Sequence, residues 1–490
     1  MRFSFLLLGL FITSTVFAQP EDQPTDYLSK EFHAVRRDSL RALMPDSSVI
    51  MVLAYPTRTF SNDVDYVYHP NPDLYYFTGY KEPQSLLLIF KEPQTAPDGT
   101  IYKEIFFIQK RDARAEQWTG RRLGIEGVQQ QLGIQMVLNG EQFKNFDINF
   151  SKFNKIIFDA FPTDATVTRD PAGLYSLIQQ FKQKANIPDN YTTDKRFDNR
   201  LFRQITGKLR EIKTPEEMTL LRKAVEISCI GQNEVMKAVQ PNMSEREVQG
   251  LHEFVHKKYG AENVGYPSIV GAGNNGCVLH YEENNKMHVE NRMILMDVGA
   301  EYHGYSADVT RTVPANGKFT AEQRAIYQIV YDAQEEAFKI CKEGTNRGDI
   351  EKKARDVVAE GLMKLGIISK KEESSIYYPH GLSHHIGLDV HDRGYSPTLK
   401  KNMVVTIEPG IYIPEGSNCD KKWWGIAVRI EDDVLIREKD CELLSVFAPR
   451  KVEDIEKMVA AKSALDDFIL PPLQSASTEK AAKSSNKKAF

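Results

Sequence analysis

The sequence predicts an α/β (α+β) fold with two domains. Short apolar runs, with turn-forming residues nearby, alternate with longer and more polar stretches through most of the 490 residues. Several of the longer stretches begin with residues that cap helices. A chain of this length can hold two or three domains with separate hydrophobic cores. We expect segments at 1–18, 19–205, 206–465 and 466–490.

The segment 1–18 has the features of a secretory signal peptide. Arg2 precedes an apolar run at 3–12, and small residues lead to a cleavage position after Ala18. The run is shorter than the roughly 20 residues that a membrane span needs. We therefore expect a periplasmic or secreted protein with no membrane span after signal cleavage. The net charge of −4 gives no basic surface for nucleic acid.

The segment 19–205 is expected to be the first domain. Residues 19–40 are polar and form a lead-in with a first helix. Four short apolar runs follow, and their alternation with polar stretches is typical of an α/β domain. The expected strands are 49–54, 86–90, 105–108 and 155–158.

Two helix starts mark the beginning of the second domain at 206–465. Thr214 can serve as an N-cap, since proline and two glutamates follow it. Ser244 and Glu247 have the spacing of a capping box. Long helices and short strand pairs then alternate to about residue 462. The segment 466–490 is rich in Ser, Ala and Lys towards its end, and we expect it to be disordered.

Five potential metal ligands each lie in a short motif of the second domain. Asp297 and Glu408 end apolar runs, where a buried carboxylate is costly unless it is paired or bound to metal. Asp308 follows Asp297 around a turn at Gly304, so a hairpin can bring both carboxylates into one site. Any one of these residues alone would be interpreted as structural. The full set is Asp297, Asp308, His384, Glu408 and Glu431.

Four carboxylates and one imidazole suit hard or borderline divalent ions. The four negative charges balance two such ions. Two metal ions roughly 3.5–4 Å apart lower the pKa of a bound water to about 7, which is the chemistry of a hydrolase. The five cysteines are too few for a disulfide scaffold, and the sequence assigns no pairing among them.

Three stretches resemble the aminopeptidase P family, which belongs with prolidase to the pita-bread metallopeptidases. They are GAGNNGCVLHY at 271–281, HGLSHHIGLDVHD at 380–392 and IEPGIY at 407–412. The resemblance extends over about 63–432. It implies an N-terminal creatinase-like α/β domain, a C-terminal pita-bread catalytic domain, and a homo-oligomer, either a dimer or a tetramer. It also implies that the chain removes the first residue from peptides whose second residue is proline.

The resemblance also implies roles for the metal ligands. Asp308 and Glu431 would bridge two divalent ions, Asp297 would hold one of them, and His384 and Glu408 would hold the other. Manganese is the expected metal, and the same ligands are compatible with cobalt or zinc. Glu408 would also carry a proton to the departing proline nitrogen.

Further residues are implied to surround the substrate. His280 and His391 would assist catalysis beside the substrate carbonyl. His380, Arg429 and Tyr412 would support the substrate pocket. Two weaker correspondences lie in the first domain, where the family takes part of its proline pocket from a neighbouring subunit: Trp118 as the ring facing proline and Asp63 as the acid near the free amino end. His385 departs from the family, which has a large aromatic or apolar residue there, and we expect it to be structural.

A rival zinc motif is present at His252, Glu253 and His256, which match the H-E-x-x-H pattern. No third ligand follows at the spacing of metzincins, and the corresponding helix of aminopeptidase P packs against the sheet. We therefore expect these histidines to be structural.

Two alternative functions remain open at this point. One is a prolidase, which cleaves Xaa-Pro dipeptides. The other is a non-catalytic pita-bread protein that binds peptides. The presence of all five ligands favours an enzyme.

Overall fold

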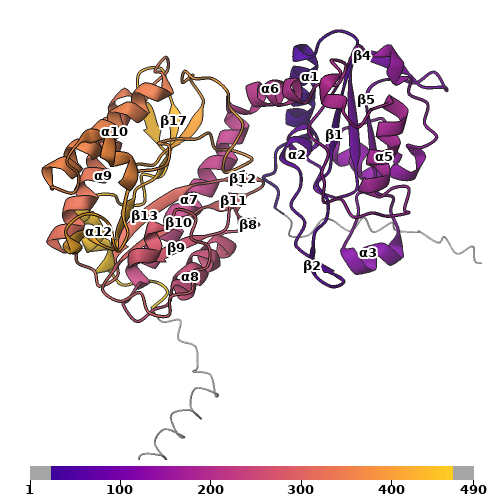
Figure 1. The fold of residues 1–490 in the computed structure, drawn as a ribbon. Helices are drawn as coiled ribbons and strands as arrows, with labels where there is room; N and C mark the ends of the chain where they lie inside the picture. Colours follow the sequence, from indigo (N-terminus) through magenta and orange to yellow (C-terminus); the bar gives the residue numbers. More distant parts are fainter. Residues whose placement is uncertain (1–23, 467–490) are drawn as a thin grey trace, which may run out of the picture.

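The computed structural model describes residues 24–466, which form two lobes joined where α6 (Asn199–Arg210) meets α7 (Pro215–Ala238) (Figure 1). The expected signal peptide lies outside the described residues. So does the expected disordered tail, apart from residue 466.

The first lobe contains the elements from α1 to α6. They are α1 (Lys30–Leu43), β1 (Ser48–Leu53), β2 (Thr59–Ser61), β3 (Val64–Asp65), α2 (Pro72–Thr78), β4 (Leu86–Thr95), β5 (Ile101–Ile108), α3 (Ala113–Thr119), α4 (Gly124–Gly127), β6 (Val137–Asn139), β7 (Lys155–Phe158), α5 (Leu174–Ala185) and α6 (Asn199–Arg210).

A five-stranded mixed sheet in the order β6-β5-β4-β1-β7 forms the centre of this lobe. β4 runs antiparallel to β1 and β5, whereas β7 is parallel to β1 and β6 is parallel to β5. Successive residues of a strand point to opposite faces, so Ile50 and Val52 enter one core while Val49 and Met51 enter another. The four expected strands are present. β4 and β5 extend further than expected, past a shift in their pairing register after Ile89.

The second lobe contains α7 to α12. Its helices are α7 (Pro215–Ala238), α8 (Glu245–Lys258), α9 (Ala321–Ile340), α10 (Arg347–Lys364), α11 (Ser374–Tyr377) and α12 (Val452–Val459). Its strands are β8 (Asn263–Val264), β9 (Ile269–Ala272), β10 (Met293–Val298), β11 (Ala300–Tyr302), β12 (Tyr305–Ser306), β13 (Val309–Pro314), β14 (Val404–Ile407), β15 (Gly410–Ile413), β16 (Ile426–Arg429), β17 (Asp432–Ile436) and β18 (Cys441–Leu443).

Both expected helix starts are confirmed. The Thr214 side chain accepts the backbone N–H of Glu217, whose carboxylate accepts the N–H of Thr214 in return. Ser244 and Glu247 make the same reciprocal pair at the start of α8. Each pair satisfies N–H groups that a helix leaves without partners at its first turn.

The layout of the second lobe repeats itself. The helix pair α7 and α8 precedes the sheet β13-β10-β9, and the helix pair α9 and α10 precedes the strands β14 to β18. The helices lie outside the strands (Figure 1). Strands from both halves share one large apolar core with α9 and α10.

A buried cluster of charges fixes the junction between the lobes. Arg210, at the end of α6, lies 2.9 Å from a carboxylate oxygen of Asp73 and 2.6 Å from one of Asp392. Asp392 also pairs with Lys213 at 3.1 Å. Removing one partner from such a cluster leaves a buried charge uncompensated. Since Asp392 follows His391 in the chain, the cluster also anchors the loop that carries this histidine.

The α/β (α+β) character expected from the sequence is confirmed by these elements. Within residues 24–466, none of the helices has both the length and the apolar character that crossing a bilayer requires.

Candidate metal centre

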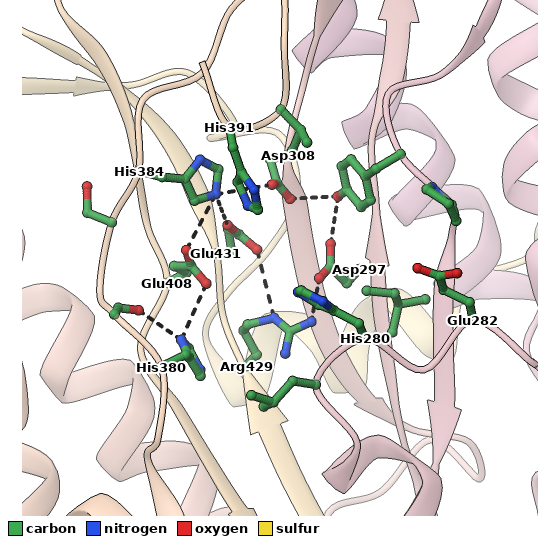
Figure 2. Close-up of a pocket in the computed structure, with 17 residues that line it drawn as sticks. His280, Glu282, Asp297, Asp308, His380, His384, His391, Glu408, Arg429 and Glu431 are labelled. Carbon is green, nitrogen blue, oxygen red and sulfur yellow. Dashed lines mark hydrogen bonds and ion pairs between the residues drawn. The ribbon is translucent and has the colours of Figure 1, made fainter. Parts of the chain in front are cut away.

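One cavity of about 380 Å³ in the second lobe receives all five expected metal ligands. Figure 2 shows their side chains facing one another across the space between the two halves of the lobe. The ligands come from different elements, and the local backbone explains how each reaches the cavity. They are Asp297, Asp308, His384, Glu408 and Glu431.

The first half of the lobe supplies Asp297 and Asp308. Asp297 lies on β10, and Asp308 lies between β12 and β13. The chain turns back between them at His303 and Gly304, whose φ angles are 49° and 84°. As a result β10 pairs with β13, and Asp297 lies opposite Thr310. The hairpin that the sequence predicts around Gly304 is therefore present.

The second half supplies the other three ligands. Glu408 directly follows β14, and Glu431 lies between β16 and β17. His384 comes from the loop before β14, where its backbone pairs with Thr406 on that strand. The Glu408 N–H donates to the carbonyl of Leu382 at 2.9 Å, so the loop and the strand end are fixed together.

His384 lies among three of the carboxylates. Its Nε2 atom is 3.5 Å from Asp308, 3.5 Å from Glu408 and 3.8 Å from Glu431. One ligand atom each from Asp308, His384 and Glu431 can be chosen so that all three lie within 4.8 Å of one another. The Nδ1 atom of His384 donates a hydrogen bond of 3.1 Å to the carbonyl of His385, so Nε2 is the ring nitrogen that faces the carboxylates.

Polar residues behind the ligands hold the carboxylates in place. The hydroxyl of Tyr266 lies 2.6 Å from a carboxylate oxygen of Asp297 and 2.6 Å from one of Asp308. Thr310 donates to Glu431 at 2.7 Å. None of these supporting contacts was expected from the sequence.

Burial and mutual repulsion raise the pKa of three carboxyl groups. Burial and the charge of Asp308 raise the pKa of Glu408 to about 7. Burial and the neighbouring carboxylates also raise the pKa of Glu431 well above its usual value, and burial with Asp297 raises that of Asp308. Asp297 is the exception: burial acts to raise its pKa, but the charge of Arg429 and the hydrogen bonds from Tyr266 and Arg429 together outweigh burial and lower it.

The imidazole of His384 shows the complementary effect. Burial acts to lower its pKa, but the hydrogen bond to Asp308 and the charge of Glu408 outweigh burial and raise it to about 9. Without metal ions, the negative charge of the carboxylates is thus reduced by bound protons. Divalent cations would neutralise it instead, and the donor set of four carboxylates and one imidazole fits two of them.

A hydrogen-bonded group borders the metal ligands on one side. Arg429 forms an ion pair with Asp297 and donates to the Tyr412 hydroxyl at 2.7 Å. That hydroxyl lies 2.8 Å from Nε2 of His380, whose Nδ1 is 3.6 Å from Glu408. Burial and the positive charge of Arg429 lower the pKa of His380 to about 4, so the ring is neutral at pH 7. His380 and Arg429 line the cavity, and Tyr412 lies directly behind them.

His280 and His391 line the cavity and are exposed. The ring of His391 meets that of His384 edge to face, with centroids 4.4 Å apart. Both histidines therefore lie where a substrate can reach them (Figure 2). Glu282 also lines the cavity, and nothing in its surrounding sequence indicated this.

Trp118 and Asp63 are not among the residues that line this cavity. Trp118 lies on α3 with 82% of its surface exposed. Asp63 lies in the exposed turn between β2 and β3. Within one chain, both belong to the surface of the first lobe.

The rival zinc motif lies on α8, away from the cavity. His252 and His256 are buried, and their ring nitrogens have no hydrogen-bond partner. In residues 24–466, no third His, Cys, Asp or Glu lies within ligating reach of the pair. Glu253 instead accepts hydrogen bonds from Gln249 and Ser268. His385 is likewise buried, and its ring fills the space beside Gly394.

Two family models match the chain. Residues 33–155 match the N-terminal domain of aminopeptidase P, and residues 219–438 match metallopeptidase family M24.

Similar proteins occur in bacteria and animals. The Xaa-Pro aminopeptidase of Escherichia coli (strain K12) is 34% identical, over 89% of this chain and 98% of that protein. Xaa-Pro aminopeptidase 3 of Homo sapiens is 30% identical, over 90% of this chain and 88% of that protein.

Solved structures agree with these matches. Aminopeptidase P of E. coli with the inhibitor Pro-Leu superimposes with a TM-score of 0.78 at 31% identity, covering 88% of this chain and 98% of that one. The zinc-substituted E. coli enzyme in complex with product gives the same TM-score of 0.78 and 31% identity, covering 89% of this chain and 100% of that one. The expected order of an N-terminal aminopeptidase P domain and a C-terminal pita-bread domain is confirmed.

Proposed function

The chain belongs to the Xaa-Pro aminopeptidases of metallopeptidase family M24, and from this premise we propose how its residues carry out the reaction. It is a metal-dependent exopeptidase that hydrolyses the first peptide bond of peptides whose second residue is proline. One observation carries this conclusion: four carboxylates and His384 face one cavity in a chain that matches aminopeptidase P over 88% of its length.

Divalent metal ions are the cofactor. Asp297, Asp308, His384, Glu408 and Glu431 would hold two of them, with Asp308 and Glu431 shared between both. When bound, such ions activate water and polarise the scissile carbonyl. We propose manganese as the metal, and the oxygen-rich ligand set supports this choice.

Glu408 is the residue we assign to proton transfer. One of its carboxylate oxygens is 3.5 Å from His384, while the other is 3.6 Å from His380, so the group extends into the cavity. A carboxylate in this position can take a proton from the attacking water and deliver it to the departing proline nitrogen.

We propose that His280 and His391 contact the substrate. Both line the mouth of the cavity, where an imidazole N–H can donate to the carbonyl oxygen as negative charge develops on it. His380 is held by the Tyr412 hydroxyl and by the carbonyl of Gly381, each 2.8 Å away. These two hydrogen bonds fix the neutral ring of His380 where it lines the pocket.

A proline in the second position needs a dedicated pocket, because its tertiary amide offers no N–H and its ring is rigid. We propose that Trp118 supplies part of this pocket and that Asp63 meets the free amino group, each reaching the cavity of a neighbouring subunit. Their exposure on the first lobe and their absence from the cavity of their own chain support this. The enzyme would then be a dimer or a tetramer.

The place of action is a separate proposal. The composition of residues 2–18 supports export and cleavage after Ala18, which would make the enzyme periplasmic or secreted. Sequencing the N-terminus of the protein recovered outside the cytoplasm tests this directly.

Peptide length distinguishes the proposed activity from that of a prolidase. We expect Xaa-Pro-Yaa peptides to be cleaved faster than Xaa-Pro, since the cavity is open to solvent beyond His280 and His391. Peptides with alanine in second position should be poor substrates, and N-acetylation should abolish cleavage. Mass spectrometry of the digests decides: rapid turnover of Xaa-Pro dipeptides beside inert longer peptides would make the enzyme a prolidase.

A further inference from the structure

Two buried glutamines occupy matching positions in the two halves of the catalytic lobe. Gln232 lies on α7 and Gln334 on α9, the first helix of each half. Both side chains are fully buried. A buried amide is tolerated only when it forms hydrogen bonds, so the partners of these two residues indicate what they hold.

Gln232 joins β10, which carries Asp297, to the start of β13, which directly follows Asp308. Its Nε2 atom donates to the carbonyl of Met296 at 2.9 Å and to that of Val309 at 2.7 Å. Met296 precedes Asp297, and Val309 follows Asp308. A primary amide has two N–H donors, so one side chain can bind both carbonyls at once.

Gln334 repeats this arrangement in the second half. Its Nε2 atom lies 2.9 Å from the carbonyl of Ile407 and 3.2 Å from that of Ile430, and it also lies 2.9 Å from a carboxylate oxygen of Asp432. These residues directly precede Glu408 and Glu431. Its Oε1 atom accepts a hydrogen bond of 2.8 Å from Arg450, which orients the amide.

Each glutamine therefore fixes the separation of two backbone carbonyls that adjoin two carboxylates. Metal–ligand distances in proteins fall within about 0.2 Å of their preferred values, so a fixed separation of the ligand-bearing backbone favours binding. We propose that Gln232 and Gln334 are positioning residues, each setting the spacing of one pair of carboxylates. The inference rests on the proposed function, because that spacing matters only if the carboxylates bind metal.

A purely structural role makes a different prediction. If the glutamines only attach helices to the strands, their loss lowers stability and leaves metal affinity unchanged. Ser228 provides the matched control. It lies on α7 one turn before Gln232, is buried, and accepts the N–H of Ala300 at 2.9 Å. Its hydroxyl contacts neither Met296 nor Val309.

The experiment compares metal-free wild-type protein with Gln232→Met, Gln334→Met and Ser228→Ala. Methionine keeps the length of the side chain and removes the amide. Calorimetric titration with Mn²⁺ gives the dissociation constants, and thermal unfolding of the metal-free proteins gives Tm. We expect Tm to fall in all three variants. The Mn²⁺ dissociation constants should rise about tenfold or more in the two glutamine variants and stay within about twofold in Ser228→Ala.

The outcomes separate the two proposals. If both glutamine variants bind Mn²⁺ with wild-type affinity and have a lowered Tm, the positioning role is wrong and the proposed function is unaffected. Wild-type protein that binds neither Mn²⁺ nor Co²⁺ nor Zn²⁺ contradicts the proposed function and the inference together. If Gln232→Met does not fold, Gln334→Met tests the same role in the other half, and Gln232→Asn, which is too short to bind both carbonyls, replaces it.

Discussion

His384 and Thr406 are joined by two hydrogen bonds. The Thr406 hydroxyl accepts the backbone N–H of His384 at 3.1 Å, and the Thr406 N–H donates to the His384 carbonyl at 2.9 Å. The imidazole thus extends from a loop whose backbone is tied to the strand that leads to Glu408. The same hydroxyl lies 3.4 Å from Glu408, so one side chain supports two metal ligands.

Thr406→Val tests this support. Valine keeps the shape of threonine but leaves the buried N–H of His384 without its partner. We expect the affinity for Mn²⁺ to fall about 10- to 100-fold, since residues that orient metal ligands have effects of this size. Thr406→Ser keeps the hydroxyl and should restore binding. Equal Mn²⁺ affinity in the valine variant and the wild type, measured by calorimetry, would show that the hydroxyl does not support the site.

Acid should destabilise the protein through His256. Burial lowers its pKa to about 4, whereas the ring of the unfolded chain titrates near 6.5. Between these values the unfolded chain binds a proton that the folded protein excludes. The contribution of the neutral His256 ring to the free energy of unfolding is fully present above about pH 6.5, and it is lost as the pH falls towards 4.

The size of this effect follows from the pKa difference. The pKa of His256 differs by about 2.5 units between the unfolded and the folded chain, and this difference corresponds to a loss of roughly 3 kcal/mol in the free energy of unfolding. Urea unfolding at pH 8 and pH 5 measures about 2 kcal/mol of this loss, because the rest follows between pH 5 and pH 4, and His256→Asn is the comparison. The variant should lose less stability than the wild type between the two pH values. Equal losses would mean that His256 takes up its proton in the folded protein.

Glu253→Gln addresses the rival zinc motif. Glu253 accepts hydrogen bonds from Gln249 at 2.8 Å and Ser268 at 3.1 Å, and glutamine can keep such contacts. Turnover of an Xaa-Pro-Yaa peptide should therefore stay within about threefold, whereas loss of a general base costs about 10²–10⁴-fold. A loss in the larger range, with an unchanged circular dichroism spectrum, would support a zinc site on α8.

Trp118→Ala tests the contribution of a neighbouring subunit. Truncating a tryptophan that closes a pocket at an interface commonly costs about 2 kcal/mol, which is more than tenfold in binding. We expect kcat/KM for Xaa-Pro-Yaa peptides to fall by at least this factor, with metal content and Tm unchanged.

Val167→Ala changes another exposed apolar residue of the first lobe and serves as the control. Light scattering gives the oligomeric state in the same buffer. If the wild-type protein is a monomer and is fully active, Trp118 of a neighbouring subunit does not contribute to the proline pocket.

Local sequence signals accounted for much of the fold and for the ligand set. Thr214 and Ser244 could be identified because a helix cap depends on residues three positions away. Asp297 and Glu408 could be identified because a carboxylate at the end of an apolar run needs compensation. By contrast, β6 is a three-residue strand whose existence depends on its pairing with β5, which the local sequence does not encode.

The supporting residues of the site escaped sequence reasoning for a related reason. Tyr266 lies 31 positions from Asp297 and 42 from Asp308, and only the folded chain brings the three together. Gln232 is 64 positions from Met296 and appears in the sequence as one polar residue within an apolar helix face. Such residues carry no motif, because their role depends on packing between distant segments.

Metal content and turnover, measured on one sample, test the central claim most directly. Elemental analysis should find two divalent ions for each wild-type chain, and a chelator should remove both the ions and the cleavage of an Xaa-Pro-Yaa peptide. Manganese should then restore both. Asp297→Asn should be folded yet nearly inactive, since one ligand loses its charge with little change in shape. Full turnover by wild-type protein that elemental analysis shows to be free of metal would contradict the account.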